Sequence, residues 1–121
     1  MVLLDSSAWL EVFYQAPLYK KFLKYLRQEG AWVVSTINLF EVYRKLAKKS
    51  EDLALEAVAK MRTGKLIEVT EGLSIEAGDL SIQYQLGMAD SLILATAYQE
   101  EVTLVTKDYD FHKIPGCKVY R

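Results

Sequence analysis

The chain has 121 residues, of which 51% are hydrophobic and 26% charged, and its formal net charge is −1 at pH 7. This length suits one domain, residues 1–121, with a buried core, and the composition excludes a disordered chain. No apolar run approaches the roughly 20 residues that cross a bilayer. The single cysteine, Cys117, excludes an intrachain disulfide and a cysteine-based zinc site. Because no basic leader precedes Val2, we expect a cytoplasmic protein without a membrane segment.

The first third of the chain predicts a strand followed by two helices. Residues 2–5 form an apolar run that ends in an acid, and Ser6 or Ser7 can cap a following helix. Pro17 suits the first turn of a second helix, and Gly30 suits its C-terminal stop. The apolar stripe of that helix comprises Leu18, Phe22, Tyr25 and Leu26.

The middle of the chain predicts a second strand and two further helices. Residues 32–34 form the strand, and Ser35 or Thr36 caps a helix that continues to about Lys49. The residues of this helix that we expect to face inward are Ile37, Phe40, Tyr43 and Leu46 or Ala47. The apolar positions of the next helix, which Gly64 ends, are Ala54, Ala57, Val58 and Met61.

The last half of the chain continues this alternation. Strands are expected at residues 66–69, 102–106 and 118–120, and helices at residues 75–86 and 89–100. Alternating strands and helices are typical of an α/β protein whose parallel sheet has helices on both faces. We therefore predict a three-layer α/β/α fold with a central, mainly parallel sheet of four to five strands.

Four carboxylates stand next to apolar runs, where an unpaired carboxylate is costly to desolvate. They are Asp5, Glu41, Asp90 and Asp108. Asp5 and Asp108 come at or just beyond the carboxyl ends of predicted strands, where ligand sites form in parallel sheets. Asp90 lies near a helix N-terminus, and Glu41 lies about one and a half turns into its helix. We therefore expect all four side chains at one edge of the sheet.

Taken singly, each acid also has a purely structural interpretation. The three aspartates could serve as turn or helix-start residues, and Glu41 could pair with Arg44 or Lys45 along its helix. Four like charges at one edge would oppose folding, however, and a divalent cation would relieve that repulsion. Ligands made only of oxygen favour Mg²⁺ or Mn²⁺, and one or two such ions are typical of phosphoryl transfer.

Four motifs support a family resemblance. In chain order they are Val2-Leu3-Leu4-Asp5-Ser6-Ser7, Thr36-Ile37-Asn38-Leu39-Phe40-Glu41-Val42, Gly87-Met88-Ala89-Asp90-Ser91-Leu92-Ile93-Leu94-Ala95 and Leu104-Val105-Thr106-Lys107-Asp108-Tyr109-Asp110-Phe111. Essentially the whole chain closely resembles the PIN-domain nucleases, most of all the small VapC-type toxins of toxin–antitoxin pairs. The resemblance lies in the chain length and in the order and spacing of the four motifs. The last two motifs are the most specific.

This resemblance implies a PIN-like fold and RNA cleavage that depends on Mg²⁺ or Mn²⁺. By position, the family's catalytic and metal-binding acids match Asp5, Glu41, Asp90 and Asp108. Ser6 and Thr106 match supporting hydroxyl residues, and Asp110 is the alternative to Asp108 as the fourth acid. The resemblance also implies a small antitoxin partner and a homodimer.

Basic residues gather in the first half of the chain, since residues 17–65 hold 11 Lys and Arg against 5 Asp and Glu. The residues that we expect to contact RNA phosphates are Lys20, Lys24, Arg44 and Lys45, although solvated helix faces would give the same pattern. Trp9, Phe13 and residues 19–26 are apolar enough to predict an exposed partner groove, in the region that helps bind the antitoxin in the family.

Two other functions remain open within a PIN fold. One is a non-catalytic RNA-binding or scaffold protein, and the other is an RNA-processing nuclease that is not a toxin. A receiver-like signalling module is disfavoured because residues 60–72 contain no Asp, and a phosphatase of the Asp-x-Asp type is excluded by Ser7. Metal-dependent cleavage by the purified protein would separate an enzyme from a scaffold.

Overall fold

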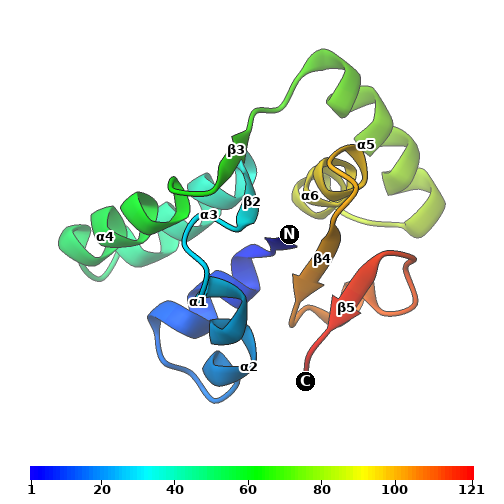
Figure 1. Cartoon of the computed structure of the whole chain (residues 1–121). Helices are drawn as coiled ribbons and strands as arrows, with labels where there is room; N and C mark the ends of the chain where they lie inside the picture. The colour runs from blue at the N-terminus through cyan, green and yellow to red at the C-terminus, as the bar shows by residue number, and fades with distance from the viewer.

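A five-stranded, wholly parallel sheet runs through the centre of the protein (Figure 1). The structure, a computed structural model, describes residues 1–121. Its strands are β1 (Val2–Leu4), β2 (Trp32–Ser35), β3 (Lys65–Ile67), β4 (Thr103–Thr106) and β5 (Cys117–Val119). Their order across the sheet is β3-β2-β1-β4-β5, so β1 lies in the middle between β2 and β4.

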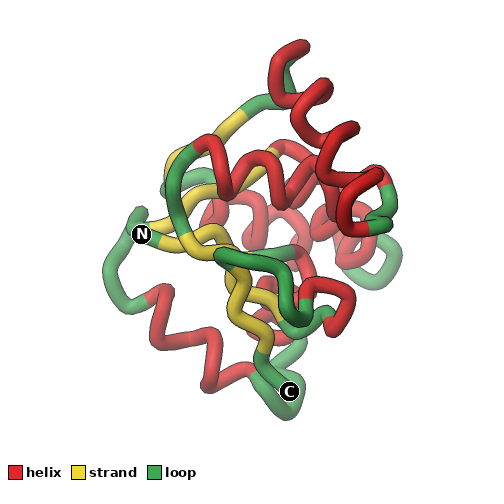
Figure 2. Tube along the Cα trace, turned by 90° about the vertical axis from the view of Figure 1, so that its right-hand side faces the viewer, coloured by secondary structure: helices red, strands yellow, loops and turns green.

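Helices cover both faces of this sheet, and in Figure 2 the strands run between helical segments. They are α1 (Ser6–Phe13), α2 (Tyr19–Leu23), α3 (Thr36–Ala47), α4 (Glu51–Met61), α5 (Glu71–Tyr84) and α6 (Met88–Gln99), with the 3₁₀ helices η1 (Lys24–Leu26) and η2 (Tyr109–Phe111). Helices α1 to α4 pack mainly on one face, and α5 and α6 on the other. The predicted three-layer α/β/α fold is confirmed. None of the helices is long and apolar enough to span a bilayer.

Side chains alternate along the strands and so divide the core into two clusters. Leu3 and Val33 pack with α5 and α6. Their neighbours Leu4 and Val34 pack with α1 to α4. The central strands are therefore apolar on both faces, which explains why each appears in the sequence as a continuous apolar run.

Some element boundaries differ from the sequence prediction. Helix α5 begins at Glu71, well before the predicted start, because the Thr70 hydroxyl accepts a hydrogen bond from the Leu73 N–H and caps the helix. The helix predicted from Pro17 is reduced to the short α2 and η1. Strand β3 is Lys65–Ile67 rather than residues 66–69.

The prediction that Phe40 and Tyr43 face the core is wrong. Phe40 is 64% exposed and Tyr43 is 38% exposed. The buried face of α3 instead comprises Asn38, Val42 and Leu46. The prediction counted only apolar residues as inward-facing and so left out Asn38. The Asn38 amide can be buried because it forms hydrogen bonds with Ser35 and Ser6.

The exposed groove predicted from Trp9, Phe13 and residues 19–26 does not include Trp9 or Phe22. Trp9 and Phe22 are both fully buried. The Trp9 ring stacks on Phe13 with centroids 5.7 Å apart and meets the edge of Trp32 at 5.5 Å. These aromatic side chains hold α1 and α2 on the sheet and leave no open groove at Trp9.

The turn between α4 and β3 provides a test of this packing at Gly64. A Cβ atom there would lie 2.3 Å from Trp32 Cδ1 and 2.5 Å from the Trp32 carbonyl oxygen. Because Trp32 is fully buried, Gly64→Ala should lower the free energy of unfolding by about 1–3 kcal/mol. Gly78→Ala is the matched control, since nothing lies within 4 Å of its Cβ position in α5, and it should stabilise by about 0.5–1 kcal/mol. Urea unfolding measures both, and equal effects would contradict the packing described.

Candidate metal centre

Asp5 is positioned by the two central strands. Strands β1 and β4 pair in parallel with Leu4 opposite Val105. The Asp5 N–H continues this ladder by donating to the Val105 carbonyl oxygen at 2.9 Å. The backbone of Asp5 is therefore fixed at the carboxyl edge of the sheet, beside Thr106 at the end of β4.

Four separate segments contribute acids to one open hollow at this edge. The hollow has a volume of about 400 Å³ and is lined by Asp5, Ser6, Ser7, Leu10, Phe40, Glu41, Arg44, Lys45, Asp90 and Asp108. Asp5 follows β1 and Asp108 follows β4, while Glu41 belongs to α3 and Asp90 to the first turn of α6. The structure thus brings together the four acids that the sequence indicates.

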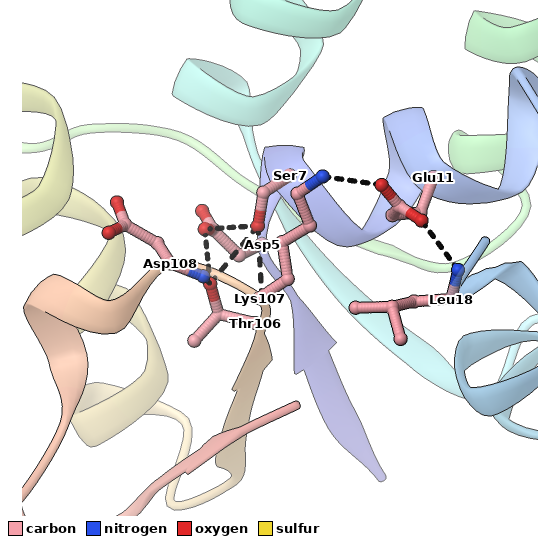
Figure 3. Close-up of polar contacts among 7 residues, drawn as sticks. All are labelled: Asp5, Ser7, Glu11, Leu18, Thr106, Lys107 and Asp108. Carbon is pink, nitrogen blue, oxygen red and sulfur yellow. Dashed lines mark hydrogen bonds and ion pairs between the residues drawn. The ribbon is translucent and has the colours of Figure 1, made fainter. Parts of the chain in front are cut away.

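Asp5 is the most buried of these acids, with 4% of its surface exposed. Its Oδ2 atom accepts hydrogen bonds from Thr106 Oγ1 at 2.7 Å and from Ser7 Oγ at 3.0 Å (Figure 3). Burial raises the pKa of Asp5, and the hydrogen bonds that it accepts offset this rise only in part. The negative charge of Glu41 raises the pKa further.

Glu41 is held by a chain of hydrogen bonds that begins at the cap of α3. Asn38 Oδ1 accepts from the Ser35 N–H at 3.0 Å, and Asn38 Nδ2 donates to Ser6 Oγ at 2.9 Å. The Ser6 hydroxyl in turn donates to Glu41 Oε1 at 2.7 Å. The Ser6 side chain therefore supports Glu41 rather than Asp5, although Ser6 directly follows Asp5 in the chain.

Asp90 carries the clearest electrostatic signature of the cluster. Its pKa is raised to about 7, first by burial and then by the charges of Asp5, Asp108, Glu41 and Asp110. A carboxylate in the first turn of a helix is by itself favoured by the helix dipole. Burial and the four neighbouring acids thus raise the pKa of Asp90 at a position where a carboxylate is otherwise favoured.

Asp108 and Asp110 both approach Asp90 from the loop after β4. One carboxylate oxygen from each of these three residues lies within 4.8 Å of the other two. Asp108 lines the hollow, whereas Asp110 is exposed and donates its backbone N–H to Asp108 Oδ1 at 2.9 Å. The Asp108 N–H donates to Thr106 Oγ1 at 2.9 Å, and Phe111 is buried in the core as predicted. Of these two acids, Asp108 is thus the one that lines the hollow with the other three.

No ion pair neutralises the four acids. The ion pairs of the chain join Lys60 to Glu29, Lys65 to Glu100 and Lys107 to Glu11. Like charges gathered in this way oppose folding unless a cation separates them. A donor set made only of oxygen fits a hard divalent ion such as Mg²⁺ or Mn²⁺, so these residues fit the metal that the sequence predicts.

A basic surface adjoins the acids along α3. A second hollow of about 380 Å³ is lined by Tyr14, Arg44, Lys45, Lys48 and Lys49. It shares Arg44 and Lys45 with the acidic hollow. Lys20 and Lys24 line neither hollow, and Lys24 Nζ lies instead 5.2 Å from the centre of the Tyr25 ring. The structure therefore brings two of the four predicted basic residues to the acids.

Two residues that orient the acids, Ser7 and Asn38, were not predicted from the sequence to do so. Besides its bond to Asp5, Ser7 Oγ lies 3.1 Å from Thr106 Oγ1 and accepts the Lys107 N–H at 3.2 Å. The signal for Asn38 was its place in a capping box with Ser35, three residues earlier. The signal for Ser7 was that two serines are adjacent. Ser6 donates to Glu41, and Ser7 donates to Asp5.

Comparison with known proteins agrees with this architecture. Residues 2–116 match the family described as PIN domain. A chain from a toxin–antitoxin complex of Klebsiella pneumoniae has a TM-score of 0.86 and 23% sequence identity, over 98% of this chain and 97% of that chain. A chain from VapBC2 of Rickettsia felis bound to promoter DNA has a TM-score of 0.75 and 22% identity, over 99% and 98%.

A third solved structure shares the fold at lower identity. VapC20 of Mycobacterium tuberculosis, described as a sarcin–ricin loop cleaving toxin, has a TM-score of 0.80 and 14% identity, over 96% of each chain. No curated protein matches the sequence significantly. At these identities the solved structures establish a common fold.

Substitution of Asp90 tests the electrostatic description of the centre. In the metal-free folded protein Asp90 holds a proton up to about pH 7, whereas its usual pKa is 3.8. The unfolded chain therefore binds fewer protons over this range, and stability should fall as the pH rises from about 4 to 7. Asp90→Asn removes this pH-dependent loss of stability, so at pH 8 the variant should be more stable than the wild type by about 1–2 kcal/mol. This is less than the whole pKa shift of Asp90 implies, because the side chain is partly exposed to solvent.

Thermal unfolding with and without Mn²⁺ measures this prediction. Mn²⁺ should raise the Tm of the wild type at pH 8 and should raise that of Asp90→Asn much less. Asp79→Asn, at an exposed position of α5, is the control and should behave like the wild type. Metal-free Asp90→Asn that is less stable than the wild type at pH 8 would contradict the description.

Proposed function

Because this chain belongs to the PIN domain family, we propose that it is a metal-dependent endoribonuclease and the toxin of a VapBC-type toxin–antitoxin pair. The observation that carries this proposal is the convergence of four carboxylates, none of them in an ion pair, in one open hollow. Such a cluster is costly for a protein to keep unless it binds cations. The structural relatives from toxin–antitoxin complexes support the choice of a toxin.

In the proposed reaction Asp5, Asp90 and Asp108 hold Mg²⁺ or Mn²⁺, as one or two ions. When bound, the metal lowers the pKa of a water molecule and neutralises charge on the phosphate. The hydrogen bonds from Thr106 and Ser7 hold the Asp5 carboxylate in one orientation, so that ligand does not have to be ordered when the metal binds.

Glu41 has the role of orienting the attacking water or of helping to hold a second ion. Its Oε1 atom is fixed by Ser6, which in turn is fixed by the buried Asn38. As a carboxylate, Glu41 can accept a proton from water that attacks the phosphorus. The bond between phosphorus and the 3′ oxygen would break as the water attacks, and the 3′ oxygen would take a proton from solvent, so the products would carry 5′-phosphate and 3′-hydroxyl ends.

RNA is the proposed substrate, with Arg44 and Lys45 contacting its phosphates. Both side chains line the acidic hollow and the basic hollow beside it, which Lys48 and Lys49 extend along α3. Cations beside the acids attract a phosphate backbone that the carboxylates alone would repel. The relative described as a sarcin–ricin loop cleaving toxin supports RNA as the substrate.

The proposed partners are a small antitoxin protein and a second copy of the chain. The relatives from Klebsiella pneumoniae and Rickettsia felis come from toxin–antitoxin complexes, which supports an antitoxin partner. The proposed place of action is the cytoplasm.

Cleavage of labelled total RNA by the purified protein tests the enzymatic proposal. We expect discrete cuts with Mg²⁺ or Mn²⁺ and none with EDTA. Asp5→Asn should fold and lose about two to three orders of magnitude in rate, because it weakens the metal site. RNA binding without cleavage would favour a scaffold protein, and cleavage without growth arrest on expression would favour an RNA-processing nuclease.

Substitution of the two shared basic residues tests the substrate surface. Arg44→Ala/Lys45→Ala should raise the KM for RNA about tenfold and reduce its dependence on salt, with a smaller effect on kcat. Lys20→Ala/Lys24→Ala removes the same charge outside both hollows and should raise KM less. Steady-state kinetics at several salt concentrations measure both, and a larger effect at Lys20 and Lys24 would show that RNA follows α2 instead.

A further inference from the structure

Glu11 is a buried acid that the proposed reaction does not use. It lies in α1, outside the acidic hollow, and its side chain is 5% exposed. Its Oε1 atom pairs with the Lys107 ammonium, and its Oε2 atom accepts the Leu18 N–H at 2.9 Å (Figure 3). A carboxylate buried to this extent is stable only with such partners.

Lys107 lies in the chain between Thr106, the last residue of β4, and the acid Asp108. Thr106 before it donates to Asp5, and Asp108 after it lines the hollow. The Lys107 backbone N–H donates to Ser7 Oγ at 3.2 Å, while its side chain reaches Glu11. Lys107 is therefore held to α1 at two points, one through its backbone and one through its ammonium group.

The segment that carries Asp108 has few other anchors on this side. The Asp108 side chain accepts only the N–H of Asp110 from its own loop, and its backbone N–H donates to Thr106 Oγ1. At the far end of the loop, Phe111 is fully buried. The pair of Glu11 and Lys107 is the ionic contact that ties the near end of this loop to α1, which also carries Ser6 and Ser7.

The charges of this pair are retained in the folded protein. Burial alone would raise the pKa of Glu11, but the hydrogen bonds from Lys107 and Leu18 and the ammonium charge outweigh it and lower the pKa. The Glu11 carboxylate is therefore kept charged where it meets the Lys107 ammonium. Lys107 is 45% exposed, so its ammonium remains in contact with water while it holds the loop.

We propose that Glu11 is a positioning residue of the metal centre, which acts through Lys107 to hold the loop of Asp108 against α1. This inference rests on the proposed function, since it assumes that Asp108 takes part in holding the metal. Under this proposal a buried charge that lies outside the acidic hollow affects metal affinity, as is common for residues that orient metal ligands.

A purely structural role is the alternative, because Glu11 also anchors Leu18 in the connection between α1 and α2. Two substitutions separate the roles. Glu11→Gln keeps an oxygen for the Leu18 N–H and removes the charge that binds Lys107. Lys107→Met leaves Glu11 and its bond to Leu18 intact but removes the ammonium.

Titration calorimetry with Mn²⁺ in the absence of RNA is the decisive experiment. Glu11→Gln and Lys107→Met should each weaken Mn²⁺ binding about tenfold, and the double variant should be no weaker than either single variant. Lys107→Arg keeps a positive charge that can pair with Glu11, so it should bind Mn²⁺ nearly as tightly as the wild type. Glu100→Gln, which removes the ion pair with Lys65 elsewhere in the fold, is the matched control and should bind Mn²⁺ like the wild type.

Amide hydrogen exchange gives a readout independent of the metal. In Glu11→Gln the amides of Lys107 and Asp108 should exchange faster than in the wild type, while the Leu18 amide should change less. Faster exchange at Leu18 alone would show a structural role and overturn the inference.

Other outcomes of the titration are equally informative. Wild-type affinity in Glu11→Gln would overturn the role of Glu11 and leave the proposed function intact. Weak binding by Glu11→Gln with normal binding by Lys107→Met would mean that a released ammonium competes with the metal, and would overturn the loop mechanism. No Mn²⁺ binding by the wild-type protein would overturn the proposed function and this inference together.

Discussion

The carboxylate of Asp5 is buried at the carboxyl edge of the sheet, and this burial constrains the rest of the site. A buried carboxylate must receive hydrogen bonds, and the donors come from the end of β4 at Thr106 and the start of α1 at Ser7. Those same two residues accept the backbone N–H groups of Asp108 and Lys107. The position of Asp5 thus fixes the start of the loop that brings Asp108 into the hollow.

Charge is the second consequence of this geometry. Asp5, Asp108, Glu41 and Asp110 all raise the pKa of Asp90, so the metal-free protein keeps an unfavourable cluster at the end of its most buried helix. The basic side chains beside it, Arg44 and Lys45, line the hollow without pairing with the acids. In the proposed function this separation leaves the acids free for a cation and the bases free for phosphates. Under that proposal, stability is given up at the site for function, as is common at functional centres.

The fold was predictable because its elements leave strong local patterns, and the four acids were predictable from their joint position at one edge of the sheet rather than singly. Continuous apolar runs mark the central strands, and acids at their carboxyl ends mark the edge where ligand sites form. The hydrogen bonds that hold the acids and their neighbours in place were not predictable, because they join residues far apart in the chain, such as Asn38 to Ser6 and Lys107 to Glu11. The prediction for Phe40 failed for a related reason. The inward face of α3 holds the buried amide of Asn38, whereas the apolar pattern had indicated aromatic residues there.

A crystal structure grown with Mn²⁺, with anomalous diffraction recorded to locate the metal, tests the central claim most directly. The claim is that acids from four segments converge to hold a divalent cation. It predicts an anomalous peak in the hollow about 2 Å from carboxylate oxygens of at least two of Asp5, Asp90 and Asp108, with any remaining contact made through water. An empty hollow at saturating Mn²⁺, or a peak bound only by the exposed Asp110, would contradict it.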